Sequence, residues 1–243
     1  MKGRSTPSRA ARVSSDKTMT VPGRGQVRAY AKRLGWRRTI ARALYVGSNQ
    51  VLDLSILDCF RMRREDIIAS LARNPRRYDC GFLSPAKAER LATQLDADVA
   101  AGLREAIRRG DEAYAILDRG RLASIGLYAS ADTPVLNDLL VRFEPPARYM
   151  YRGFTQDEYR GQRLHALGIL RAAGELFDRG VPQLVTVVEH TNYPASISVH
   201  RMGWRPCGFL YRFGWGGRYR LGRSRTAAGM GMELRRRDPV DRV

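Results

Sequence analysis

A short basic turn between a predicted strand over residues 149–154 and a predicted helix over residues 161–178 carries the strongest chemical signal. A glycine-containing turn that opens a helix leaves several backbone N–H groups without acceptors, at the positive end of the helix dipole. Arg160 and Arg163 add guanidinium groups suited to phosphate oxygens. The turn is therefore expected to bind an anion, although an ordinary strand-to-helix turn that happens to be basic has the same residues.

Alternating strand and helix patterns surround this turn. Two apolar runs, residues 113–117 and 122–128, flank a turn that contains Gly120 and predict a β-hairpin. A helix is expected over residues 84–109, starting at Ser84-Pro85, and a short helix over 192–202. Helical periodicity over 161–178 ends before Gly180 and Pro182. Further strands are expected over residues 139–143, 149–154, 184–188, 209–213 and 230–234.

Residues 145–205 resemble the GNAT superfamily of N-acetyltransferases. The segment DEYRGQRL is similar to that family's pyrophosphate-binding turn, (Q/R)-x-x-G-x-(G/A), which a strand precedes. The segment VVEHTNYPASISVHRMGW is similar to the family's next block, a strand followed by Asn192, the small residue Ala195 and a terminal Gly203-Trp204. The two motifs in this order are more specific than either one alone.

The resemblance implies an α/β (α+β) fold with a GNAT-like mixed, splayed central sheet flanked by helices, here with a basic N-terminal extension. It implies that acetyl-CoA or another acyl-CoA lies between strands 149–154 and 184–188. The pantetheine arm would pair with backbone near the end of the first strand, and the pyrophosphate would rest on residues 160–165. The implied cofactor-binding residues are Phe154, Thr155, Arg160, Gly161, Gln162, Arg163, Leu164, His165 and Asn192, the last bonding the pantetheine or a neighbouring main-chain group.

The implied reaction is direct attack of an acceptor amine on the thioester. It needs a deprotonated nucleophile, donors toward the oxyanion and a proton for the leaving thiolate. Glu189 and His190 lie at the end of the second strand, where a base could act directly or through water; a solvated strand-end residue is the plainer interpretation of each. No metal is expected.

This chain departs from the family pattern at three positions. Arg163 and His165 stand where glycine or a small residue is usual, which narrows the space near phosphate unless their own side chains contact it. A surface role is the plainer interpretation of His165. The family often places a tyrosine acid where this chain has Val199, which cannot donate a proton. Ser196, one turn back on the same helical face, or water is the expected substitute.

The net charge of +19 is concentrated at the N-terminus, because residues 1–50 hold twelve Lys/Arg and only one acid, Asp16. Such a surplus attracts nucleic acid, anionic lipid, acidic carrier proteins or nucleotide phosphates. Residues 211–225 mix aromatic residues with arginines, a composition that stacks on bases and holds phosphates, or that closes over an acyl donor.

The expected organisation is a flexible basic tail (residues 1–25), a basic helical extension (26–75), a GNAT-like domain (76–237) and a C-terminal tail (238–243). One helix over 27–45 would either pack its apolar face on its own domain or lie on a membrane surface. That face would comprise Val27, Tyr30, Ala31, Leu34, Ala41, Leu44 and Tyr45.

A cytoplasmic protein is expected, because the chain has no signal-peptide h-region and no apolar run near the ~20 residues that cross a bilayer. The Arg-rich start is also typical of organelle transit peptides. The three cysteines, Cys59, Cys80 and Cys207, form no metal-binding or CxxC pattern and are expected to be reduced.

The sequence therefore predicts an N-acyltransferase that moves an acyl group, acetyl in the first place, from acyl-CoA to an amine. An acyl carrier protein is the alternative donor. The alternative classes are a nucleic-acid-binding basic protein with a non-catalytic GNAT-like domain, and a CoA-binding module without turnover. No motif before residue 150 indicates the acceptor.

Overall fold

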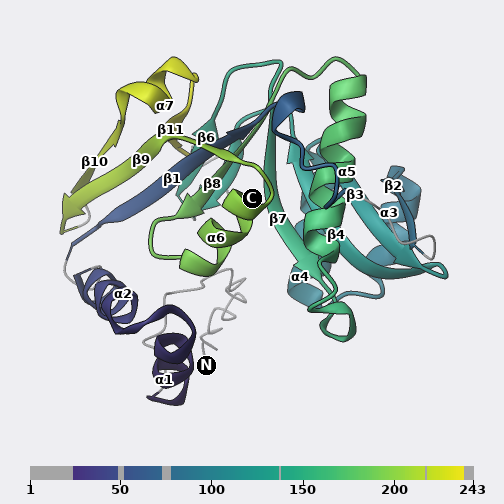
Figure 1. Cartoon of the computed structure of the whole chain (residues 1–243). Helices are drawn as coiled ribbons and strands as arrows, with labels where there is room; N and C mark the ends of the chain where they lie inside the picture. Colours follow the sequence, from purple (N-terminus) through teal and green to yellow (C-terminus); the bar gives the residue numbers. More distant parts are fainter. Residues whose placement is uncertain (1–23, 49–51, 73–77, 137, 217, 238–243) are drawn as a thin grey trace, which may run out of the picture.

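The computed structural model describes residues 24–48, 52–72, 78–136, 138–216 and 218–237 (Figure 1). The expected flexible tails lie almost entirely outside these residues. An eight-stranded sheet has the order β10-β9-β1-β8-β7-β4-β3-β2, and a three-stranded sheet has the order β11-β6-β5. The strands are β1 (Ser55–Met62), β2 (Tyr78–Phe82), β3 (Glu112–Asp118), β4 (Arg121–Ala129), β5 (Thr133–Leu136), β6 (Leu139–Arg142), β7 (Arg148–Thr155), β8 (Leu184–Glu189), β9 (Arg205–Trp215), β10 (Arg218–Arg223) and β11 (Glu233–Arg236).

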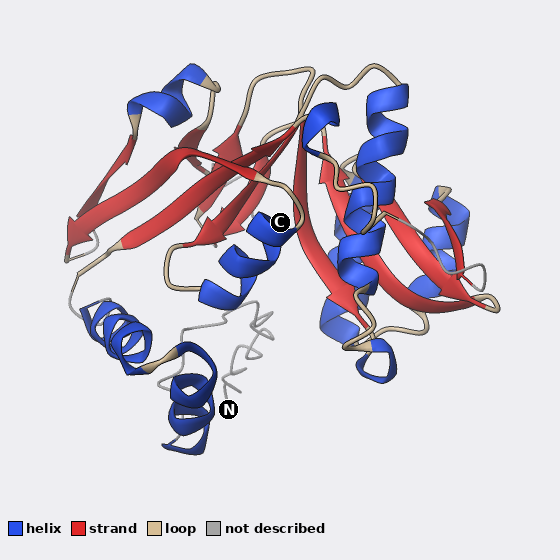
Figure 2. Cartoon of the chain, in the orientation of Figure 1, coloured by secondary structure: helices blue, strands red, loops and turns tan. Residues whose placement is uncertain are grey.

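Helices cover both faces of the large sheet (Figure 2). They are α1 (Arg24–Leu34), α2 (Trp36–Ser48), α3 (Pro85–Ala92), α4 (Ala97–Arg108), α5 (Leu164–Asp178), α6 (Tyr193–Arg201) and α7 (Arg225–Gly229). Helices α5 and α6 contribute to one core cluster, whereas α3, α4, α7 and the small sheet contribute to the cluster on the other face. The pair β7–β8 is parallel and the other described pairs are antiparallel, so the expected mixed sheet flanked by helices is confirmed.

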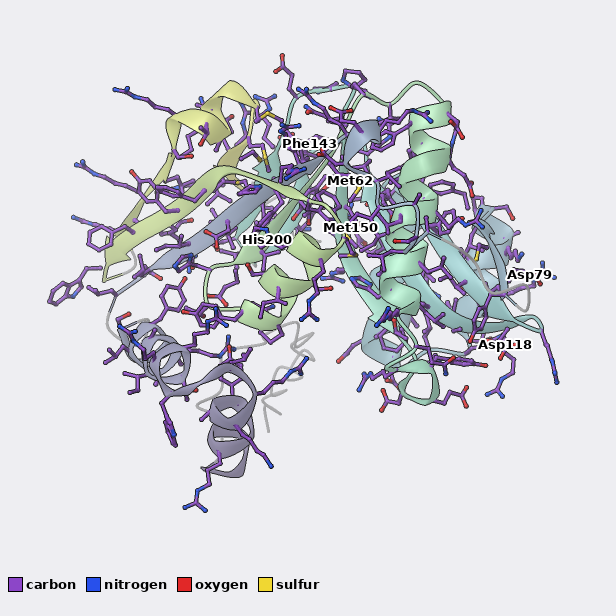
Figure 3. All side chains as sticks on the ribbon, in the orientation of Figure 1. Met62, Asp79, Asp118, Phe143, Met150 and His200 are labelled. Carbon is purple, nitrogen blue, oxygen red and sulfur yellow. The ribbon has the colours of Figure 1, made fainter. Side chains whose placement is uncertain are left out.

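The core on the α5–α6 face joins residues from both ends of the chain. Met62 of β1 and Met150 of β7, labelled in Figure 3, belong to one buried cluster with Trp204, which is 1% exposed. The α5 helix contributes Ile169, Leu170 and other apolar residues at helical spacing, as its sequence pattern predicts. This packing fixes α5 against β3, β4 and β7.

Several element predictions need correction. The expected helix over residues 84–109 is two helices, α3 and α4. The Ser84 side chain caps α3 by accepting from the Lys87 amide at 3.3 Å, as its position predicts. Residues 230–234 do not form a strand of the main sheet; β11 begins at Glu233 and pairs with β6.

The N-terminal segment also differs from the expected single helix. Gly35, with φ +86°, separates α1 from α2, because a left-handed residue ends a helix. The expected shared apolar face is therefore wrong: Ala31 and Tyr45 are buried, but Ala41 and Leu44 are exposed. The side chain of Val27 lies outside the described residues.

The segment expected to be a helical extension contains a central strand. Strand β1 lies between β8 and β9 and pairs with both of them antiparallel. Part of residues 26–75 is therefore integral to the main sheet. Among the described residues, no helix is long and apolar enough to cross a membrane.

Candidate functional site

Strands β7 and β8 begin side by side and then separate. Their register comprises two pairs, Arg148 with Leu184 and Tyr149 with Val185. The Thr186 hydroxyl then donates to the Met150 carbonyl oxygen at 2.8 Å, and beyond this point the two strands have no further register pair. Figure 1 shows the strands diverging toward their carboxyl ends. Facing strand edges that part in this way leave main-chain groups available to an extended ligand.

A β-bulge lies in β7 where the two strands have separated. The β4–β7 register shifts between Ile125 and Leu127, so that Arg152 and Gly153 together oppose Gly126. Arg152 has φ 46°, a conformation that is rare for a residue with a side chain. Such strain persists only where the surroundings fix it, and it is concentrated at functional sites.

Side chains hold the bulge from both faces of the sheet. A Cβ atom added to Gly153 would overlap the imidazole ring of His165, which therefore packs directly on the bulge. On the other face, a Cβ atom at Gly102 of α4 would overlap the guanidinium group of Arg152. Glycine at these two positions lets the two side chains lie against backbone.

The turn after β7 is anchored at both ends. Tyr159 and Leu164 are 8% and 2% exposed, and the Tyr159 hydroxyl donates to Asp118, which Figure 3 labels, at 3.2 Å. Between them Gly161 has φ +81° and Arg163 has φ +60°. A turn with such left-handed residues can point successive amides outward as an anion-binding concavity.

The start of α5 presents donors to this turn. The hydrogen bonds of α5 to the turn start with the Leu167 amide, which donates to the Arg163 carbonyl oxygen at 3.0 Å. Within the described part of the chain, the amides of Leu164, His165 and Ala166 have no protein acceptor, as expected of a first helical turn. No atom lies within 4 Å of the place a Gly161 side chain would take, so the turn is open above its backbone.

The predicted phosphate ligands occupy different environments in this turn. Arg163 is exposed and has no carboxylate partner among the described residues. Arg160 is also exposed and pairs with Asp157 at 2.7 Å. The Gln162 side chain accepts from the Tyr78 hydroxyl at 2.7 Å, and this contact ties the turn to β2. Burial lowers the pKa of His165, so the ring is neutral near pH 7 and adds no positive charge.

The carbonyl group of Phe154 and the hydroxyl group of Thr155 both contact β4. The Ser124 hydroxyl donates to the Phe154 carbonyl oxygen at 2.8 Å and lies 2.9 Å from the Thr155 hydroxyl. Asn192 caps α6, because its side-chain oxygen accepts from the Ala195 amide at 3.4 Å. A bond from Asn192 to a neighbouring main-chain group was one of the two roles expected of this residue.

The two candidate bases after β8 differ in their surroundings. One carboxylate oxygen of Glu189 accepts from the amide and hydroxyl of Thr191 at 3.0 and 2.7 Å, and the other lies 3.8 Å from Arg42. The Nδ1 atom of His190 lies 3.0 Å from both carboxylate oxygens of Asp58. His190 is half exposed, and its Nε2 atom has no partner among the described residues. Both carboxylate oxygens of Glu189 thus have neighbours in the protein, whereas Nε2 of His190 has none among the described residues.

Ser196 lies on α6, one turn before Val199. Val199 is 8% exposed and packs in the α5–α6 core, so no side chain that can donate a proton stands at that position. Ser196 is half buried, and within the described residues its hydroxyl makes no hydrogen bond. The structure thus brings Glu189, His190 and the start of α6 to the carboxyl end of β8, beside the diverging strands.

Two polar groups near the site, those of Asp58 and Tyr128, could not be predicted from the sequence. Asp58 precedes His190 by 132 residues, and only the unexpected place of β1 brings them together. The Tyr128 hydroxyl is buried without a hydrogen-bond partner and lies 3.6 Å from the place a Gly126 side chain would take, next to the bulge. Burial raises the Tyr128 pKa, so this hydroxyl stays protonated. Among the described residues, no group of three His, Cys, Asp or Glu could hold a metal ion.

The cysteines take no part in this arrangement. All three are free, and Cys59 and Cys207 are buried in the core on the face opposite α5 and α6. Burial raises the pKa of Cys207 to about 11 and also raises that of Cys59, so both thiols are protonated at neutral pH.

Solved structures with a similar fold include several GNAT proteins. A GCN5-related N-acetyltransferase from Kribbella flavida is 13% identical, with 72% of this chain and 64% of that chain covered and a TM-score of 0.44. A GCN5-related N-acetyltransferase-like protein from Streptococcus suis is 12% identical, with 75% and 68% covered and a TM-score of 0.47. A tandem GNAT protein from the clavulanic acid biosynthesis pathway is 16% identical, with 75% and 58% covered and a TM-score of 0.44.

The chain spans 58% to 68% of the length of these three proteins. No protein-family model and no curated protein sequence matches the chain. At these identities the similarity concerns the fold, and the activity of this chain is inferred from its own residues.

Proposed function

We propose that this protein is an acyltransferase that moves an acyl group from a CoA thioester to an amine. The observation that carries the proposal is the pair of parallel strands, β7 and β8, that part after two register pairs beside an anchored turn with outward amides. The carboxyl ends of adjacent parallel strands are a common place for ligands in α/β folds. A phosphate-bearing ligand with an extended arm fits both features.

The diphosphate of the donor would bind at the start of α5. The amides of Leu164, His165 and Ala166, together with the exposed guanidinium group of Arg163, supply donors at the positive end of the helix dipole. Because the turn is fixed by the buried side chains of Tyr159 and Leu164, these donors are held in place before the ligand arrives. The pantetheine arm would then lie along the open edges of β7 and β8.

His190 is proposed as the general base. Asp58 accepts from Nδ1 and so orients the ring with Nε2 free to take a proton from the acceptor amine. The amine nitrogen forms a bond to the thioester carbonyl carbon, the C–S bond breaks, and the thiolate leaves. Ser196 or water would protonate the thiolate, since Val199 cannot.

The anion-binding turn is tested by matched glycine variants. Gly161 and Gly120 both have φ +81° and open space around the place of a side chain, but Gly120 lies in the β3–β4 turn. The two substitutions Gly161→Val and Gly120→Val therefore impose the same backbone strain at different places. Isothermal titration should show that Gly161→Val weakens binding of acetyl-CoA and of CoA at least tenfold, while Gly120→Val leaves binding unchanged.

Two results would count against the proposal. Equal affinity of both variants for acetyl-CoA would show that the diphosphate does not bind at this turn. Binding without turnover on any of a panel of amines would support the alternative of a CoA-binding module. The same titration with an acyl carrier protein tests the alternative donor, because the basic surface also attracts an acidic donor protein.

The hairpin formed by β9 and β10 favours a second candidate function, binding of single-stranded nucleic acid. Phe209, Tyr211, Phe213 and Trp215 alternate along β9 and are 37% to 71% exposed. Arg218 and Arg220 lie opposite Trp215 and Phe213 in the register. Aromatic and arginine side chains on one sheet face stack on bases and contact phosphates. Such binding should fall steeply with salt and survive Gly161→Val.

A further inference from the structure

Helix α2 presents its apolar side to solvent. Trp36, Ile40 and Leu44 recur every four residues, and they are 61%, 54% and 69% exposed. At 3.6 residues per turn they lie within an arc of roughly 80° on the helix surface. Figure 2 shows α1 and α2 at the edge of the molecule, beyond the end of the large sheet.

The opposite side of α2 makes the contacts with the domain, through polar groups and through buried side chains that include Val46. The Arg42 guanidinium donates to the Thr191 carbonyl oxygen at 2.9 Å, and the Tyr45 hydroxyl accepts from the Ile56 amide at 2.8 Å. The guanidinium group of Arg38 lies over the Tyr193 ring. Because amphipathic helices of globular proteins normally bury the apolar side, α2 has the reverse orientation.

The surroundings of this stripe are strongly basic. Helices α1 and α2 contain seven Lys/Arg and no acid. In the part of the chain that the structure describes, the exposed cations of these helices pair with no carboxylate: Arg28, Lys32, Arg33, Arg37 and Arg38. A partner for this face must therefore offer both an apolar interior, into which these side chains can insert, and negative charge.

We propose that the α2 face defined by Trp36, Ile40 and Leu44 binds the surface of an anionic lipid bilayer. A helix with tryptophan and aliphatic residues on one side and flanking cations lies in the interface, where apolar side chains enter the acyl boundary and cations meet headgroups. A second copy of the chain would bring two acid-free basic helices together, which like-charge repulsion opposes. Nucleic acid offers no apolar interior for Ile40 and Leu44.

Flotation of the full chain with lipid vesicles tests this proposal. The wild-type protein should bind vesicles of phosphatidylcholine with phosphatidylglycerol and bind pure phosphatidylcholine much less, with weaker binding as salt rises. The triple variant Trp36→Gln, Ile40→Gln, Leu44→Gln should reduce binding to anionic vesicles by tenfold or more. Because these side chains are exposed, the variant should fold, and an unchanged midpoint of urea unfolding checks this independently of the acyltransfer proposal.

A matched control removes exposed apolar surface elsewhere. The double variant Phe209→Gln, Phe213→Gln changes β9 side chains that are 44% and 52% exposed, and it should keep vesicle binding. Equal loss in both variants, or no binding of the wild type to anionic vesicles at low salt, would overturn the proposal. It would also be overturned if the wild type were a dimer that the α2 variant dissociates, or if the α2 variant lost binding of a single-stranded oligonucleotide instead of vesicles.

Discussion

The imidazole of His190 is held by Asp58, whose two carboxylate oxygens both lie 3.0 Å from Nδ1. The two residues come from neighbouring strands of the sheet, since His190 directly follows β8 and Asp58 lies in β1. The backbone adds a second link, because the His190 amide donates to the Ile56 carbonyl oxygen at 2.9 Å. In the proposed reaction Asp58 would therefore act through His190, as a positioning residue.

The substitution His190→Gln is expected to lower kcat with an acyl-CoA donor by about 100-fold, a low value for loss of a general base. The KM for the donor should change little, because the proposed diphosphate site lies at the start of α5, after β7, and not at the end of β8. Asp58→Asn should lower kcat by a smaller factor and alter the pH profile of kcat, since the amide no longer favours one ring orientation. Steady-state kinetics over a range of pH measures both effects.

His200, an exposed residue of α6, provides the control for this prediction. His200→Gln should leave kcat close to the wild-type value. Unchanged kcat in His190→Gln would exclude His190 as the base and would direct attention to Glu189 or water.

The sequence predicts the elements that carry the site better than it predicts their neighbours. Local signals predict the hairpin β3–β4 and the order of β7, α5, β8 and α6. These signals are alternating or β-branched apolar runs, helical periodicity, the glycine at 180 that follows α5 and the proline at 194 in the first turn of α6. These signals also place the basic turn at the start of α5. The mixed, splayed sheet that the family resemblance implied is also confirmed, and β7 and β8, which a helix separates, form its parallel pair.

Long-range relations are what the sequence does not predict. Nothing in residues 55–62 indicates that β1 lies between β8 and β9, because strand pairing depends on the complementarity of the whole sheet. The partner of His190 was therefore missed. The contact of Arg42 with the domain was missed for a related reason, because its acceptor is a carbonyl group 149 residues away in the sequence. Apolar periodicity alone predicts that the opposite face of α2 packs on the core.

Two buried tyrosines on adjacent strands provide a matched test of the core. The Tyr114 hydroxyl donates to Glu175 at 2.7 Å, whereas the Tyr128 hydroxyl has no partner among the described residues. Tyr114→Phe should lower the free energy of unfolding by about 1 kcal/mol, the usual net value of such a bond. Tyr128→Phe should leave it unchanged or raise it, because a buried polar group without a partner is removed.

Thermal or urea unfolding distinguishes these two variants. For a chain of this length, 1 kcal/mol corresponds to a change in Tm of about 2–4 °C. A loss of stability in Tyr128→Phe as large as that in Tyr114→Phe would mean that the Tyr128 hydroxyl has a bound partner, such as an internal water beside the bulge.

The packing of His165 on the bulge makes stability depend on pH. Burial lowers the His165 pKa below its ordinary value of about 6.5, so the unfolded chain binds a proton more readily than the folded one. The contribution of His165 to stability is therefore fully present above pH ~6.5 and is lost as pH falls toward its lowered pKa. The variant His165→Gln cannot take up this proton and should show a smaller fall in stability over the same range. Urea unfolding of both proteins between about pH 7.5 and pH 5 measures the difference in slope, and parallel slopes would show that the ring is not buried in solution.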